Sequence, residues 1–375
     1  MRVTHLSVRG FRSYAAATLT LGERLTVLSG PNGAGKTNLL EALYFGCVGR
    51  SCRTSNEREL VRFGESVARV EVSAESATGP HELSVGFSPG DAKKMNVDGV
   101  GVERLQDAPE RPLVAVFLPD RLELVKGTPQ VRRAHLDQVV AALWPARVAN
   151  RRRYARALAQ RNALLGRIRS GEASRDSLGA WDTELARHGI ALIADRAATV
   201  EELSSRFASS AGDLGLDGKP ELGYRPRSHA TDASELASEL AERVELDLTR
   251  GFTSHGPHRD DLALRRAGRE LRAYGSQGQQ RLAVLALLLA ERAAIASTRD
   301  APPLMLLDDV LSELDPDRRA MLVDLLVAGG QSVITTADPA DLPSGGRVGV
   351  THIAVRDGAV VPVASGDVPA LEAAA

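Results

Sequence analysis

The chain has 375 residues, which is room for two or three domains and excludes a peptide-sized fold. Its 47 Lys and Arg residues nearly cancel 48 Asp and Glu residues, for a net charge of −1, so total charge points neither to a nucleic-acid binder nor to an acidic tail. With 25% charged and 43% hydrophobic residues, the composition is that of a globular protein and excludes intrinsic disorder.

Cysteine content and hydropathy bear on the compartment. The two cysteines, Cys47 and Cys52, are too few for a disulfide framework, and no Cys or His follows them at zinc-ligand spacing. The longest apolar run, Leu282 to Ala290, is far shorter than the ~20 residues of a membrane span, and the N-terminus lacks a signal pattern. We therefore expect a cytoplasmic protein without a membrane partner.

The first 120 residues show strand patterns and one helix. Residues 4–8 and 83–87 alternate apolar with polar side chains, and residues 25–28 form a short apolar run. Asp98-Gly99 supplies the positive φ angles of a tight hairpin turn.

From about residue 131 to 207 the apolar spacing becomes helical. Pro145 and the pair Ser170-Gly171 divide this stretch into about three helices. Another amphipathic helix is expected over residues 236–248, after which strands and helices alternate again. The pattern predicts a helical insertion within an α/β domain.

The strongest local motif is Gly30-Pro31-Asn32-Gly33-Ala34-Gly35-Lys36-Thr37, a complete P-loop between a strand and a helical run. Its glycines allow backbone N–H groups to face a phosphate, and the helix N-terminus adds partial positive charge. We expect Lys36 to reach the outer phosphates and the Thr37 hydroxyl to bind Mg²⁺. The alternative is a glycine-rich turn before a helix.

A second element of the same chemistry lies far downstream. The apolar strand Leu304 to Leu307 ends in Asp308 and Asp309. A buried strand in an α/β protein can place such carboxylates beside a phosphate loop. Asp308 is the expected Mg²⁺ ligand, together with Thr37. Asp309 and Lys36 are the expected catalytic residues, and Asp309 is positioned to orient or deprotonate the attacking water. In isolation, Asp-Asp after a strand also fits a helix cap.

The segment Ser276-Gln277-Gly278-Gln279-Gln280 opens an apolar helix and resembles the signature motif of ABC-type ATPases. That resemblance implies that its serine serves the nucleotide held by the P-loop of a second copy, in an ATP-dependent homodimer. Ser312-Glu313-Leu314-Asp315 resembles the D-loop, so Ser312 and Asp315 are expected to couple the two heads. The alternative for Ser276 is an ordinary helix cap.

Taken together, the motifs resemble the RecF family of bacterial DNA-repair ATPases, which is related to the SMC and Rad50 heads. The matching segments follow the family's order: Gly10-Phe11-Arg12-Ser13-Tyr14, the P-loop with Asn38, Pro119-Asp120, Gly127-Thr128-Pro129, Arg132-Arg133-Ala134-His135-Leu136-Asp137, Gly256-Pro257-His258-Arg259-Asp260-Asp261, Ser276 to Gln280 and Leu307 to Asp315.

The resemblance implies an α/β fold, an ABC/SMC-like P-loop ATPase head with an inserted all-α helical arm domain. The head would comprise residues 1–120 and 211–375, and the arm residues 121–210. It also implies ATP and Mg²⁺ as cofactors, weak DNA-dependent ATP hydrolysis without covalent change to DNA, and action at gapped single-strand/duplex DNA in recombinational repair and replication restart. RecR, with RecO, is the implied partner, and RecA is loaded indirectly.

Several positions depart from the family or from ABC transporters. His135 replaces a usual aromatic residue and Thr128 a smaller residue. Thr335-Thr336 stand where transporters carry a switch histidine, which implies slow hydrolysis. The Q-loop residue is expected within residues 117–120. His255 and His258 beside two aspartates also allow a metal site, although a structured loop is favoured.

Eight arginines and no acid lie between Arg147 and Arg169. Such a stripe can neutralise DNA phosphates, and Arg151, Arg152, Arg153 and Arg156 are the expected DNA contacts. Because Tyr154 is its only aromatic residue, duplex backbone is favoured over stacked single-stranded bases. The alternative is a solvated helix face balanced by acids on neighbouring helices.

Two other classes of ATPase remain open. The ATPase subunit of a membrane transporter keeps its P-loop and signature closer together than Lys36 and Ser276, which are 240 residues apart. A Rad50-like nuclease-associated head carries a much longer coiled coil, whereas a 30-residue helix reaches only about 45 Å. A clamp that binds ATP without hydrolysis is a further alternative.

Overall fold

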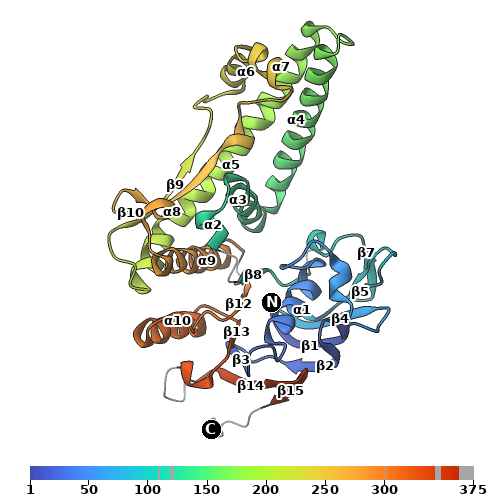
Figure 1. Ribbon diagram of the computed structural model, residues 1–375, viewed down its shortest axis with the longest axis vertical. Coiled ribbons are helices and arrows are strands. Elements are labelled where there is room, and N and C mark those ends of the chain that lie inside the picture. Colours follow the sequence, from blue (N-terminus) through green and yellow to red (C-terminus); the bar gives the residue numbers. More distant parts are fainter. Residues whose placement is uncertain (109, 119–121, 300, 343–347, 363–375) are drawn as a thin grey trace. The chain divides into compact units, whose positions relative to one another are not determined.

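The computed structural model describes residues 1–108, 110–118, 122–299, 301–342 and 348–362. The chain forms two units: unit 1 comprises Met1–Asp120 and Ile295–Ala375, and unit 2 comprises Arg121–Ala294 (Figure 1). Among the described residues, no helix is long and apolar enough to cross a membrane.

One of the two sheets of unit 1 is antiparallel, with strand order β2-β1-β4-β5-β6-β7. The apolar positions of β1 and β5 alternate with polar ones, as expected for a sheet with one buried face. Asp98 and Gly99, both at positive φ, close the predicted hairpin. The strands are β1 Arg2–Phe11, β2 Tyr14–Thr20, β4 Ala68–Ser76, β5 Gly79–Phe87, β6 Lys94–Val97 and β7 Val100–Val102.

The second sheet of unit 1 has the order β15-β14-β3-β13-β12-β8, and every neighbouring pair except β14 with β15 is parallel. Its central strands are buried at every position because both faces are covered. The strands are β3 Leu25–Ser29, β8 Val114–Phe117, β12 Leu304–Leu307, β13 Ser332–Thr336, β14 Val350–Arg356 and β15 Ala359–Pro362.

Helix α1 (Lys36–Val48) contacts strands of both sheets, and one apolar core includes side chains from all three (Figure 1). Helix α10 (Pro316–Ala328) follows β12, and the 3-10 turns η1 (Glu57–Leu60), η2 (Leu105–Asp107) and η7 (Pro339–Asp341) complete the regular structure. This arrangement fixes the turn between β3 and α1 at the carboxyl edge of the parallel sheet.

Unit 2 contains the expected helical arm. Its three main helices are separated at Pro145 and at Ser170-Gly171, as predicted. Helix α4 packs along the 36-residue α5. The helices before β9 are α2 Glu123–Lys126, α3 Pro129–Leu143, α4 Val148–Arg169 and α5 Leu178–Asp213, with the 3-10 turns η4 Pro145–Arg147 and η5 Arg175–Ser177.

Unit 2 also contains a three-stranded antiparallel sheet, β11-β10-β9. Because β9 packs on α5 and β10 on α3, the expected boundary at residue 210 falls inside this unit. Its strands are β9 Pro220–Arg225, β10 Asp261–Arg266 and β11 Arg269–Glu270; its other helices are α6 Ala233–Ala241, α7 Val244–Arg250, η6 Pro257–Arg259, α8 Leu271–Tyr274 and α9 Gln277–Arg299, whose last five residues belong to unit 1.

The prediction of a single helix over residues 236–248 is wrong, because the chain forms two short helices there. α6 ends at Ala241 and α7 begins at Val244. The apolar positions Leu236 and Leu240 on α6 and Leu248 on α7 are buried in separate clusters of unit 2. The break between the helices therefore places the two ends of the apolar pattern in different clusters.

Candidate nucleotide site

The P-loop forms the turn between β3 and α1, with Gly30, Gly33 and Gly35 at φ values of 156°, 84° and 105°. A Cβ on Gly30 would lie 2.1 Å from the Val355 carbonyl oxygen. A Cβ on Gly35 would lie 2.7 Å from the Tyr14 hydroxyl. Backbone conformation and close packing both require glycine at these two positions.

Lys36, the first residue of α1, folds back over this turn. Its Nζ donates hydrogen bonds to the carbonyl oxygens of Gly30, at 2.6 Å, and Pro31, at 3.0 Å. Burial lowers the pKa of the Lys36 amine, and the negative charges of Asp309 and Asp308 act in the opposite direction. The ammonium is thus held at the mouth of the loop, at the place predicted for a phosphate-binding lysine.

The structure brings Thr37 and Asp308, 271 residues apart, into direct contact. The Thr37 hydroxyl lies 2.9 Å from both carboxylate oxygens of Asp308. The Thr335 hydroxyl donates to Asp308 Oδ1 at 2.7 Å and accepts from the backbone N–H of Asp309 at 2.9 Å. Three adjacent segments of the sheet edge therefore share one hydrogen-bonded cluster.

The sequence motifs do not point to Thr335 as a site residue, because they mark this position only by the absence of a switch histidine. Its position at the carboxyl end of β13, between β3 and β12, was available as a signal because parallel strands end at one sheet edge. Asp309 has φ 47°, a left-handed conformation, and caps no helix. The structure therefore does not support the alternative that the Asp308-Asp309 pair is a helix cap.

The donor set of this edge fits Mg²⁺. Hydroxyl and carboxylate oxygens are the ligands that this hard cation prefers, and Thr37 and Asp308 offer both within one cluster.

The alternative metal site at His255 and His258 is not supported. His255 Nε2 bonds the Glu239 carboxylate, and His258 bonds Tyr154 and the Thr253 carbonyl. Among the described residues, no three or more His, Cys, Asp or Glu side chains come together in a group that could hold a metal ion.

The signature segment belongs to unit 2, whereas the P-loop belongs to unit 1. The Ser276 hydroxyl accepts from the Gln279 N–H at 3.3 Å, and the Gln279 side chain accepts from the Ser276 N–H at 3.0 Å, a reciprocal capping box for α9. Gln280 is buried and donates to the Leu271 and Gly275 carbonyls. Ser276, Gln277 and Gly278 are exposed at the start of the helix.

The D-loop residues follow β12. Ser312 donates to the Asp309 carbonyl at 3.1 Å, and Asp315 caps α10 by accepting from the Arg318 N–H at 2.9 Å. The segment 117–120, expected to hold the Q-loop residue, includes residues 119 and 120, which lie outside the described residues. Asp315 therefore has a local structural role in addition to the predicted coupling role.

The arginine stripe does not form one uniform face of α4. Arg161 is fully buried and bonds Asp182 at 2.6 Å and Asp247 at 2.7 Å. Arg147 lies 3.4 Å from Asp195, whereas Arg153 and Arg156 are exposed. Charge balance by neighbouring acids therefore holds for the inner side of the helix.

The other two expected DNA contacts are also on the outer side of α4. Arg151 is half exposed and lies 3.7 Å from Asp137, and Arg152 is exposed. Tyr154 is buried and bonded to His258, so it offers no ring to a base. The outer side keeps the basic character that the stripe predicted.

Comparison with known proteins identifies the family. Residues 2–348 match the model of the RecF/RecN/SMC N-terminal domain. The chain is 39% identical to the DNA replication and repair protein RecF of Anaeromyxobacter sp. (strain Fw109-5), covering 97% of this chain and 100% of that protein. It is 40% identical to the protein of the same description from Myxococcus xanthus (strain DK1622), covering 90% and 91%.

A solved structure described as the recombination mediator protein RecF-ATP in the RecFOR pathway superposes with a TM-score of 0.85 at 28% identity. It covers 97% of this chain and 98% of that one. The predicted fold class, an ABC/SMC-like ATPase head with a long helical insertion, is confirmed. With a matching family model over most of its length and full-length relatives, the chain belongs to the RecF family of DNA replication and repair proteins.

Proposed function

We propose that this chain is an ATP-dependent DNA-binding protein of recombinational repair, and that ATP with Mg²⁺ at the P-loop controls its hold on DNA. The observation that carries this proposal is the direct bonding of Thr37 to Asp308 beside Lys36. When bound, Mg²⁺ would neutralise negative charge on the phosphates. Thr37 and Asp308 would hold it, Lys36 would bind the outer phosphates, and Asp309 would orient water.

The active form is proposed to be a homodimer with composite sites, in which Ser276 to Gln280 of one copy complete the P-loop of the other. Exposure of Ser276 and Gly278 at the N-terminus of the 23-residue α9 supports this, because such a helix start favours an anionic phosphate. Ser312 and Asp315 would couple the two heads. Hydrolysis is expected to be slow and to time release from DNA.

DNA contact is assigned to the arm, within residues 121–210, through Arg151, Arg152, Arg153 and Arg156 on the outer side of α4. These contacts suit duplex backbone, next to single-strand gaps. By analogy with the relative described in the RecFOR pathway, RecR with RecO is the proposed partner and RecA loading the outcome, in the cytoplasm.

Mixing two defective variants tests the composite site. Lys36→Ala removes the P-loop charge and Ser276→Ala the signature hydroxyl, so neither variant alone should dimerise with ATP on duplex DNA. A mixed dimer regains one intact site, made by the P-loop of the Ser276→Ala copy and the signature of the Lys36→Ala copy. Partial recovery of ATP-dependent dimers in the mixture is expected in analytical ultracentrifugation.

Two results would contradict the composite site: either variant dimerising alone, or a mixture no better than its components.

The duplex contacts have a separate test. Changing Arg151, Arg152 and Arg153 to Ala should lower the slope of log affinity against log salt by about 2.7 for three lost phosphate contacts. An unchanged slope would remove the arm from the DNA site and leave the nucleotide site standing.

A further inference from the structure

The three-stranded sheet of unit 2 carries an open hollow that the nucleotide and arm sites do not use. Its volume is about 730 Å³. It lies at the edge strand β11 and continues over α8. The lining residues are Arg225, Arg265, Gly268, Arg269, Glu270, Ala273 and Tyr274.

Strand register explains why basic side chains meet here. Arg265 of β10 lies opposite Glu270 of β11, and Arg225 of β9 lies opposite Asp261, four residues before Arg265 along β10. Side chains an even number of residues apart on a strand share a face, so Arg225, Arg265 and Glu270 project to one side of the sheet. The turn between β10 and β11 has only two residues, Ala267 and Gly268, both at positive φ.

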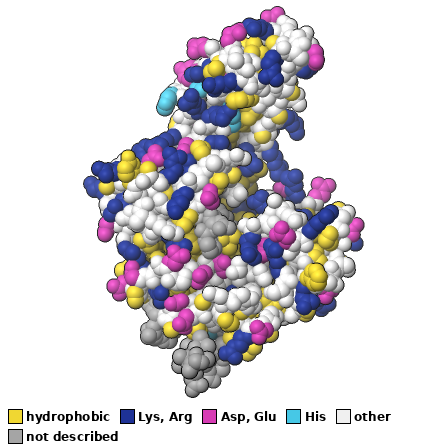
Figure 2. Space-filling view, viewed as in Figure 1, with side chains coloured by type: hydrophobic (Ala, Val, Ile, Leu, Met, Phe, Trp, Pro, Cys, Tyr) yellow, Lys and Arg dark blue, Asp and Glu magenta, His cyan; other side chains and the backbone are white. Residues whose placement is uncertain are grey.

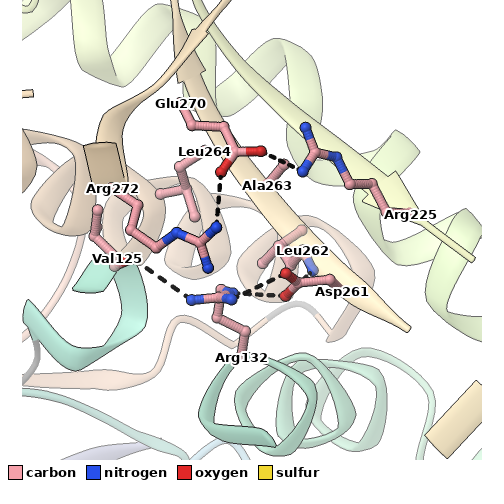
Figure 3. Close-up of a pocket in the computed structure, with 9 residues that line it drawn as sticks. All are labelled: Val125, Arg132, Arg225, Asp261, Leu262, Ala263, Leu264, Glu270 and Arg272. Atoms are coloured by element: carbon pink, nitrogen blue, oxygen red, sulfur yellow. Dashed lines mark hydrogen bonds and ion pairs between the residues drawn. The ribbon is translucent and has the colours of Figure 1, made fainter. Parts of the chain in front are cut away.

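The charges of the hollow do not cancel. Glu270 is shared by Arg225 and Arg272, as Figure 3 shows. Arg265 and Arg269 have no ion-pair partner among the described residues, although Glu221 lies opposite Arg265 in the register. The lining therefore has three arginines and one glutamate, and Figure 2 shows Lys and Arg side chains gathered over β9, β10 and α8.

The adjacent cavity drawn in Figure 3 has a structural role. Its volume is about 10 Å³, which is room for about one water molecule. Arg132 fills its base and bonds both carboxylate oxygens of Asp261, at 2.6 and 2.9 Å. These contacts fix β10 under the hollow, so the arginines above it are presented from a rigid support.

An aromatic ring lies at the rim of the hollow. Tyr274, the last residue of α8, is 71% exposed, and the Arg269 guanidinium lies 5.6 Å from its ring centroid. An exposed ring beside basic groups is the arrangement on which unpaired bases stack while arginines hold the phosphates. The arm differs, because its Tyr154 is buried.

We propose that this hollow binds single-stranded nucleic acid, with phosphates on Arg265 and Arg269 and a base on Tyr274. The proposal rests on the proposed DNA-binding function and adds a second subsite to it, separate from the duplex contacts on α4. A duplex would leave Tyr274 without an accessible base face, and an acidic peptide would not need the ring. The exposed ring therefore favours a single strand.

Fluorescence anisotropy with labelled oligothymidylate, in the absence of nucleotide, tests the site on the full chain. Arg265→Ala/Arg269→Ala should weaken binding about tenfold at low salt. It should lower the salt slope by about 1.4, since each single-strand phosphate contact contributes ~0.7. Tyr274→Ala should weaken binding about tenfold, and Tyr274→Phe should bind like the wild type because the ring remains.

The matched control is Arg9→Ala/Arg104→Ala, which removes two exposed arginines of unit 1 and the same net charge. Unchanged oligothymidylate affinity in the hollow variants would overturn the proposal. So would equal weakening of duplex binding, or displacement of oligothymidylate by polyglutamate with no effect of Tyr274→Ala. Failure of the α4 variants to weaken duplex binding would count against the proposed arm site alone.

Discussion

Unit 1 and unit 2 both gather charged groups away from water, but with different partners. At the sheet edge of unit 1, Asp308 is bonded by two hydroxyls, those of Thr37 and Thr335. Inside unit 2, Arg161 is held between Asp182 and Asp247. A hydroxyl can leave a carboxylate at modest cost, whereas a buried guanidinium leaves an unpaired charge.

That difference separates a site that can exchange ligands from a scaffold that cannot. A second guanidinium of unit 2, Arg196, bonds Asp137 and Asp260 in addition to the Pro257 carbonyl, and Tyr224 also donates to Asp260. These contacts join α3, α5 and β9 to the loop before β10. These ionic groups of unit 2 therefore hold its helices to its sheet, whereas Asp308 of unit 1 is bonded by hydroxyls that a ligand can replace.

The largest effect is expected from Arg161→Met. Removing the guanidinium leaves Asp182 and Asp247 buried without their partner, which should lower the free energy of unfolding by about 3–5 kcal/mol. Urea unfolding followed by circular dichroism measures the change. Arg153→Met on the exposed side of the same helix is the control and should stay within about 0.5 kcal/mol. Equal effects of the two variants would show that the buried pairs are not what stabilises unit 2.

The scaffold of unit 2 should also respond to acid through His258. Burial lowers its pKa to about 4, below the ordinary 6.5, with smaller opposing and supporting contributions from the Thr253 carbonyl, Arg259, Arg133 and Asp247. In the unfolded chain His258 takes up a proton near pH 6.5, whereas in the folded chain it stays neutral until about pH 4. Stability should therefore fall as pH drops from about 6.5 to about 4, by up to about 3 kcal/mol.

His258→Gln removes the titrating ring, so the wild-type minus variant difference isolates this contribution from other groups. The wild-type minus variant difference in unfolding free energy should decrease from pH 7 to 5.5 and again to 4.5. A constant difference across this range would mean that His258 is not the group that titrates.

At the edge of unit 1, Thr335→Val tests whether the hydroxyl cluster serves the metal. The isosteric change removes the bonds to Asp308 Oδ1 and from the Asp309 N–H, at a stability cost of roughly 1–3 kcal/mol. The Mg²⁺ concentration needed for half-maximal ATP binding should rise about tenfold, as for other residues that orient a metal ligand. Thr335→Ser should restore both quantities, and a loss of stability without a change in Mg²⁺ dependence would limit Thr335 to folding.

The sequence could predict what depends on local spacing. The P-loop, the strand ending in Asp308 and the breaks in the helical arm each follow from neighbouring residues. It could not rank the arginines of α4, because the partners that bury Arg161 lie 21 and 86 residues away. The sequence also did not predict that the sheet of unit 2 packs with the helices of the arm, since a short strand such as β9 and the two-residue β11 show little alternation of apolar and polar residues.

The smallest effect concerns Asp315, where a structural and a coupling role coincide. Asp315→Ala removes the N-cap of α10 and should cost about 1 kcal/mol. Asp315→Asn keeps an oxygen that can accept from the Arg318 N–H, so stability should recover. If Asp315 also couples two heads, Asp315→Asn should remain defective in ATP-driven dimers on duplex DNA, because the carboxylate charge is absent. Full recovery of both properties would reduce Asp315 to a helix cap and leave the composite site dependent on Ser276 and Lys36.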